Sequence, residues 1–169
     1  MPKYNKKITR LMDYDELKTA IDDLPIDKRA LLTILFFAGC RISEALALTS
    51  AAVSCRKDMM YVQFFRLKGS KQTDPTEIPK TEALVWLCQQ EGKLFDFTYI
   101  TAYRTVKKVF PSLYPHYFRM NRITKVADQF GDSTVYHLFG ITANSIDHYR
   151  GKVDIKRVGV ALRKEVMQE

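Results

Sequence analysis

The sequence contains few cysteines, and none of them has a metal-binding spacing. Cys40, Cys55 and Cys88 are its three cysteines; they are widely separated, and no CxxC pair occurs. An odd number of distant cysteines predicts a reduced protein without a disulfide framework. Neither a His/Cys set nor a carboxylate cluster suggests a metal, so we expect no catalytic metal and no other cofactor.

Long hydrophobic runs are also missing. No apolar stretch approaches the length that spans a bilayer. The first ten residues, MPKYNKKITR, are basic but lack the apolar core of a signal peptide. We therefore expect no membrane partner and a location in the cytoplasm.

Acidic residues are fewer than basic ones. The chain has 19 Asp and Glu against 27 Lys and Arg, which gives a net charge of +8 and a pI near 9.4. Such a balance favours a polyanionic partner, because each phosphate that Lys or Arg neutralises releases a counterion. Composition alone does not decide this, since many basic proteins never bind nucleic acid. With 169 residues, 46% of them hydrophobic, the chain can form one globular domain.

The hydrophobic pattern predicts a mainly α domain with a small antiparallel β-hairpin. Residues 1–12 resemble a basic arm or linker, and residues 13–169 form the expected domain. Residues 59–65 are rich in aromatic and β-branched types and predict a strand, with a short returning strand at 76–79. Helical spacing predicts helices near residues 13–24, 27–38, 42–48, 81–90, 99–110, 115–130, 133–139, 144–149 and 154–167.

Two segments hold basic residues that a purely structural design does not require. Arg41 follows a helix that is apolar on nearly every side, so its charge must be paired or directed at an anion. A salt bridge to Glu44 is the simpler interpretation of that segment alone. Lys68 and Lys71 lie at the tip of the expected hairpin. Exposed lysines there usually serve solvation, and the alternative is an ammonium that reaches a phosphate.

Two further segments stand closer to the C-terminus. His116 and Arg119 are three residues apart on one expected helix, so they share a face near its N-terminus, where an anion is favoured. A capping histidine and a surface arginine are the alternative. Tyr149 is one of nine tyrosines, and a tyrosine is far more often a packing residue than a nucleophile.

The order of these segments is more informative than any one of them. An arginine in a GxRxxE context, a hairpin lysine, an HxxR helix and a tyrosine 30 residues later form a rare combination. With it, the sequence resembles the catalytic domain of the tyrosine recombinases, or phage-type integrases. AGCRISEALALT, LKGSK, HYFR and ITANSIDHYRG resemble that family's four motifs, over residues 13–150. The resemblance implies five catalytic residues: Arg41, Lys68, His116, Arg119 and Tyr149.

The resemblance also implies a reaction and its partners. Tyr149 would attack double-stranded DNA and form a 3′-phosphotyrosyl link without metal or ATP, in a tetramer on two duplexes. The tail after Tyr149, with its helix near 155–167, would contact a neighbouring subunit or fold back on its own core. The separate helical domain that the family carries before this one is not seen, so the chain is an excised fragment or a naturally minimal protein. Further phosphate contacts are expected from Arg66, Lys71, Arg104, Lys107, Lys108 and Arg122.

One position departs from the family pattern. The family places a histidine or tryptophan nine residues before the tyrosine, where this chain has Gly140. Either that catalytic group is missing, or a water molecule or a neighbouring residue replaces it. His137, one helical turn away, is a candidate for the replacement, although a structural role suits it better. Motifs this loose are typical of recombinases from archaeal viruses and plasmids. The alternative functions are a type IB topoisomerase, which shares the same residues, and a DNA-binding module that has lost catalysis.

Overall fold

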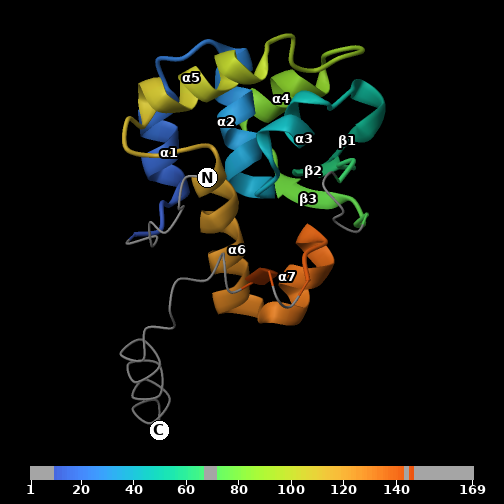
Figure 1. Cartoon of the computed structure of the whole chain (residues 1–169). Helices are drawn as coiled ribbons and strands as arrows, with labels where there is room; N and C mark the ends of the chain where they lie inside the picture. Colours follow the sequence, from blue (N-terminus) through green and yellow to red (C-terminus); the bar gives the residue numbers. More distant parts are fainter. Residues whose placement is uncertain (1–9, 67–71, 143–144, 147–169) are drawn as a thin grey trace, which may run out of the picture.

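The computed structural model describes residues 10–66, 72–142 and 145–146. Helices form most of it, and three short strands form one sheet (Figure 1). This confirms the predicted fold class. In chain order the elements are α1 (Tyr14–Ile21), α2 (Ile26–Ala38), α3 (Ile42–Leu46), the 3-10 turn η1 (Ser50–Ala52), β1 (Val53–Arg56), β2 (Met59–Val62), β3 (Thr76–Pro79), α4 (Glu82–Cys88), α5 (Tyr99–Val109), α6 (His116–Phe130) and α7 (Asp132–Phe139).

Helix α2 is the centre of the larger of two hydrophobic clusters. Every residue from Ala30 to Phe36 is buried, as its all-round apolarity predicts. α1, α3, α4, α5, α6 and β3 all contact it, and Figure 1 shows it running through the middle of the upper part of the molecule. The helix ends at Gly39, whose φ of 58° is left-handed, so the chain turns sharply there toward Arg41.

The sheet has the order β1-β2-β3 and is antiparallel throughout. β2 and β3 are the two strands of the predicted hairpin, and Met60 pairs with Ile78 in the core. β1 was not predicted, because its sequence VSCR is short and largely polar. It lies on the outer edge of β2, where Val53 pairs with Val62.

Helices α6 and α7 form a second, smaller hydrophobic cluster. It contains Ile123, Val126 and Ala127 of α6 together with Val135 and Phe139 of α7. Figure 1 shows α6 leading away from the α2 cluster, with α7 at the end of the molecule opposite α5. The two predicted helices at 115–130 and 133–139 are therefore confirmed, with the second starting one residue earlier. Most of the predicted 144–149 helix and the whole C-terminal tail lie outside the described residues.

One expectation needs correction. The structure joins Cys55 of β1 to Cys88 of α4 in a disulfide, whereas the cysteine count predicts none. Their separation of 33 residues gives no hint that the fold brings β1 against α4. Met12, the last residue of the expected arm, is buried, and its N–H donates to Asn121 Oδ1 at 3.0 Å. Met12 is thus in contact with α6 of the predicted domain.

Within the part of the chain that the structure describes, no helix has the length and apolarity that crossing a membrane requires.

Candidate active site

Arg41 is the N-cap residue of α3 and binds Glu44, three residues later. Its backbone N–H donates to Glu44 Oε2 at 2.8 Å, and its Nη1 donates to Glu44 Oε1 at 2.7 Å. The salt bridge that the sequence suggests is therefore present. It does not exclude a phosphate role, because a guanidinium carries five N–H donors in a fixed plane, and the Arg41 side chain keeps 19% of its surface exposed.

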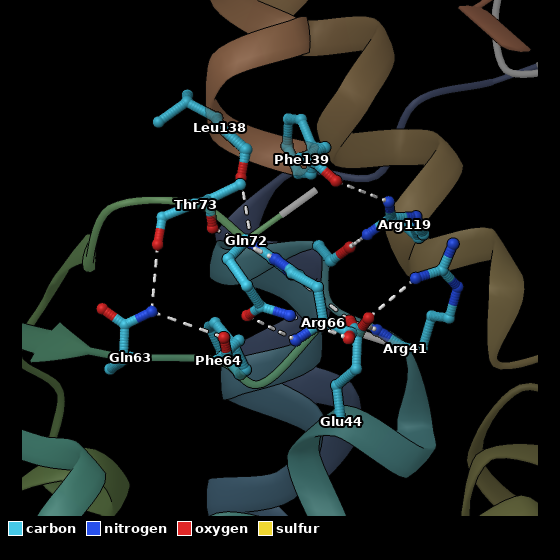
Figure 2. A network of polar contacts seen from close by, with 11 residues as sticks. Arg41, Glu44, Gln63, Phe64, Arg66, Gln72, Thr73, Arg119, Leu138 and Phe139 are labelled. Carbon is cyan, nitrogen blue, oxygen red and sulfur yellow. Dashed lines mark hydrogen bonds and ion pairs between the residues drawn. The ribbon is translucent and has the colours of Figure 1, made fainter. Parts of the chain in front are cut away.

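Glu44 also holds a second arginine. Its Oε2 lies 3.3 Å from Arg66 Nη1, and both side chains have no exposed surface. Figure 2 shows Arg41 and Arg66 directed at this carboxylate from different segments of the chain. Burying an ion is unfavourable unless its charge is paired and its hydrogen bonds are satisfied. One carboxylate therefore lies between two guanidinium groups and offsets part of their positive charge.

Arg119 lies beside this group, one helical turn into α6. It is fully buried; its Nη1 donates to the Gly39 carbonyl at 2.9 Å, and its Nη2 donates to the Phe139 carbonyl at 3.3 Å. Its guanidinium also lies over the Phe139 ring, 5.4 Å from the centroid. Gly39 is two residues before Arg41, so this bond brings the two arginine motifs of the sequence together.

The electrostatics of the group follow from burial and proximity. Burial raises the pKa of Glu44, but hydrogen bonds from Arg41 and the charges of Arg66 and Arg119 outweigh it, so the pKa lies below its ordinary value. Burial lowers the pKa of Arg66, and the Glu44 carboxylate opposes that change. Since the ordinary pKa of an arginine lies far above neutral pH, Arg66 stays charged there. The site therefore concentrates positive charge around one carboxylate.

Arg66 lies in the interior of the protein. It was expected to contact DNA phosphates, but it is buried and donates inward, to Glu44, to Thr73 Oγ1 at 3.2 Å and to the Leu138 carbonyl at 2.9 Å. A signal for this was present in the sequence. Side chains alternate between the two faces of an extended chain, and Met60, Val62, Phe64 and Arg66 have the same parity and are all buried.

The other candidate residues occupy separate parts of the structure. His116 is the first residue of α6 and is exposed. Arg104 and Lys108 are exposed on α5. Lys107 bonds to the Pro111 carbonyl and lies 4.2 Å from the centroid of the Tyr114 ring. Arg122 on α6 is partly buried. Lys68, Lys71 and Tyr149 lie outside the described residues.

Gly140 has a structural reason to be glycine. It ends α7 in the left-handed region, at φ 61°, and its N–H donates to the Tyr136 carbonyl. A side chain is strained in that conformation, so a histidine here would require a different helix end. His137 is exposed on α7. Among the described residues, no group of three or more His, Cys, Asp or Glu could hold a metal ion.

No protein-family model and no curated protein matches the chain, whereas solved structures do. XerH site-specific recombinase, in a pre-cleavage complex with difH, matches with a TM-score of 0.70 at 18% identity over 92% of this chain. XerA recombinase matches with 0.63 at 18% over 99%. A lambda integrase dimer bound to a COC′ core site matches with 0.60 at 14% over 85%.

These matches define the class of fold. The chain has the fold of a tyrosine recombinase catalytic domain, as the sequence resemblance predicts. It spans 55% of the XerH chain, 66% of the XerA chain and 48% of the lambda integrase chain, so it corresponds to about half to two thirds of each of those proteins.

Proposed function

We propose that the protein is a site-specific DNA recombinase or integrase that cuts and rejoins strands through a phosphotyrosyl link at Tyr149. The observation that carries this proposal is the hydrogen bond from Arg119 to the carbonyl of Gly39. It places the HxxR helix against the start of the Arg41 motif within a fold shared with recombinases and integrases. Arg41 and Arg119 are 78 residues apart in the sequence. The segments that carry them are nevertheless in contact in the folded protein.

The proposed chemistry assigns each side chain a role. Arg41 binds a non-bridging oxygen of the phosphodiester, because guanidinium groups bind phosphate with directed hydrogen bonds and remain charged. Arg119 takes the same role when its Nη2 exchanges the 3.3 Å bond to the Phe139 carbonyl for the phosphate. They also stabilise the charge that develops in the transition state. The Tyr149 phenolate attacks phosphorus and becomes the new ester oxygen, while the 5′ oxygen departs.

Two further groups handle protons. Lys68 gives a proton to the departing 5′ oxygen as the general acid, and His116 holds the phosphate or exchanges a proton with Tyr149. The phosphotyrosyl ester conserves the energy of the broken bond, so a 5′ hydroxyl can rejoin the strand without ATP. None of these steps uses a metal ion, and we expect cleavage to proceed in the presence of EDTA.

The proposed partner is double-stranded DNA. In support, the XerH structure is bound to a difH substrate, the lambda integrase structure to a core site, and the matching Tn1549 integrase structure to transposon right end DNA. Exposed Arg104 and Lys108, with Lys107, Arg122 and Lys71, would contact the backbone without reading its sequence. Strand exchange would take place in a tetramer on two duplexes, with residues 155–167 contacting a neighbouring subunit. Such an enzyme works in the cytoplasm of a prokaryotic host, where its DNA is.

A covalent trapping assay tests the proposal. The protein is mixed in EDTA with a pool of nicked duplexes from which the short 5′-hydroxyl fragment is lost after cleavage. We expect a protein–DNA adduct that survives denaturing electrophoresis with wild type and is absent with Tyr149→Phe. Joining of strands from two duplexes then separates a recombinase from a topoisomerase, which relaxes supercoils in a single duplex. A protein that forms no adduct with any DNA, even with an upstream clamp domain added, contradicts the proposal.

A further inference from the structure

The guanidinium of Arg66 joins three parts of the chain that are far apart in sequence. Nη1 pairs with Glu44 of α3 at 3.3 Å, Nε donates to Thr73 Oγ1 before β3 at 3.2 Å, and Nη2 donates to the Leu138 carbonyl in the last turn of α7 at 2.9 Å. Figure 2 shows Arg66 at the centre of this network. All three nitrogens are used, and no part of the side chain is exposed.

This position lies between the two hydrophobic clusters. Phe64 and Ile42, close to Arg66 and Glu44 in sequence, belong to the α2 cluster, whereas Phe139 belongs to the α6–α7 cluster. The carbonyls at a helix C-terminus have no partner within the helix and carry partial negative charge, so a buried cation there is favourable. Arg66 binds one such carbonyl, Leu138, and Arg119 binds the next, Phe139.

We propose that Arg66 is a positioning residue that fixes the C-terminal end of α7 against Glu44 and Arg41. Because Tyr149 follows Leu138 by 11 residues, this bond sets the point from which the nucleophile-bearing segment begins. The inference rests on the proposed function for its catalytic meaning, while the link between Arg66 and α7 holds independently of it. A planar guanidinium is required, since an ammonium is a point charge without the directed fork that meets three acceptors.

The backbone of Arg66 has its own anchor, which permits a clean substitution. Its N–H donates to Gln72 Oε1 at 3.1 Å, and its carbonyl accepts from Gln72 Nε2 at 3.1 Å. Arg66→Lys therefore keeps this reciprocal pair and keeps a positive charge for Glu44, but loses the directed bond to Leu138. Arg56→Lys, an exposed position in β1, is the matched control.

Hydrogen exchange tests the structural link without requiring activity. In Arg66→Lys we expect amides of α7 to exchange about 10-fold faster than in wild type, because local opening governs exchange. Amides at the centre of α2 should exchange as in wild type, and Arg56→Lys should match wild type at both helices. If α7 exchanges at the wild-type rate in Arg66→Lys, the inference is wrong, whatever the protein does to DNA.

Single-turnover cleavage of a nicked duplex at saturating protein tests the catalytic consequence. We expect Arg66→Lys to slow cleavage about 100-fold, since small misplacement of a reacting group has effects of that order. The Kd for DNA should stay within about 2-fold of wild type, with an unchanged salt dependence. A weaker Kd with a salt slope reduced by about one would instead show that Arg66 binds phosphate directly, and would overturn the inference.

A substitution in the leaving group shows whether Arg66 affects the placement of the nucleophile or the departure of the 5′ oxygen. Sulfur in place of the bridging 5′ oxygen departs without a proton, so this substrate should restore cleavage by Lys68→Ala. Arg66→Lys should remain slow on it, because its defect concerns the nucleophile. Restored cleavage by Arg66→Lys would contradict the inference. If wild type cleaves neither substrate, the proposed function fails, and hydrogen exchange still decides whether Arg66 holds α7.

Discussion

The carboxylate of Glu44 and the guanidinium of Arg66 form a buried ion pair, with 3.3 Å between Glu44 Oε2 and Arg66 Nη1. Neither side chain has any exposed surface. The other oxygen of Glu44 binds Arg41 at 2.7 Å. One acidic residue therefore holds the residue that we propose binds phosphate together with the residue that we propose positions α7. Because Glu44 and Arg66 are buried, removing the carboxylate leaves the Arg66 guanidinium buried without a counter-charge.

Glu44→Gln should destabilise the fold strongly. The substitution keeps the shape of the side chain but leaves two guanidinium groups without their counter-charge, and breaking a buried pair costs about 3–5 kcal/mol. Glu82→Gln is the control: Glu82 pairs with Arg29 at 3.5 Å, but its side chain is 80% exposed, so we expect a loss below about 1 kcal/mol. Urea unfolding measures both, and equal losses for the two variants would contradict a special role for Glu44.

The same ion pair predicts a pH dependence of stability. The pKa of Glu44 is lowered in the folded protein, so its stabilisation is complete above the unfolded pKa of about 4.3. It is lost as the pH falls from there through the folded pKa, because the unfolded state then binds more protons. Urea unfolding between neutral and acid pH should show a decline that is shallower in Glu44→Gln. An identical acid decline in both proteins would show that other carboxylates cause it.

Gly39→Ala should be far more disruptive than Gly92→Ala. Both glycines have a left-handed φ, 58° and 67°, but a Cβ at Gly39 would lie 2.8 Å from Arg122 Cβ and from Phe139 Cε1, whereas nothing lies within 4 Å at Gly92. Strain alone costs about 1–2 kcal/mol at each site, and overpacking adds about 1–3 kcal/mol at Gly39. Thermal unfolding measures the melting temperatures of the two variants. Similar melting temperatures would contradict the prediction, because they would mean that Arg122 of α6 and Phe139 of α7 can move away from a Cβ at position 39 at little cost.

Reduction of the Cys55–Cys88 disulfide should lower stability. A cross-link over 33 residues stabilises by about 3–4 kcal/mol through the entropy of the unfolded chain.

Burial raises the pKa of the Cys40 thiol to about 12, so Cys40 should resist alkylation until the protein unfolds. Mass spectrometry after denaturing alkylation should find one free thiol. Three free thiols in protein purified without reductant would show that the pair is reduced, the usual state of cytosolic proteins other than those of hyperthermophiles.

The helices and the central hairpin could be predicted from the sequence, because each rests on a local pattern. α2 is apolar on nearly every side, and α6 lies between Pro115 and Gly131. β1 was missed because four largely polar residues carry no such pattern. Its place depends on pairing with β2 and on the disulfide to α4, and both are contacts between residues distant in sequence.

The candidate site was predicted in part. The motif order predicts a shared site for Arg41 and Arg119, and their segments are in contact through the Gly39 carbonyl, while their catalytic roles stay predictions. Arg66 was expected among the phosphate contacts, but it is buried on the same side of the extended chain as Phe64. The role of Glu44 as the shared partner of two arginines depends on the tertiary fold, which no single motif reveals.

The most direct test of the central claim is to identify the residue that carries DNA after cleavage. The trapped adduct is digested with nuclease and protease, and the modified peptide is sequenced by mass spectrometry. Our account predicts a nucleotide 3′-phosphate esterified to Tyr149, formed equally well in EDTA and absent from Tyr149→Phe. A nucleotide on any other side chain, or an adduct that Tyr149→Phe still forms, would contradict the account.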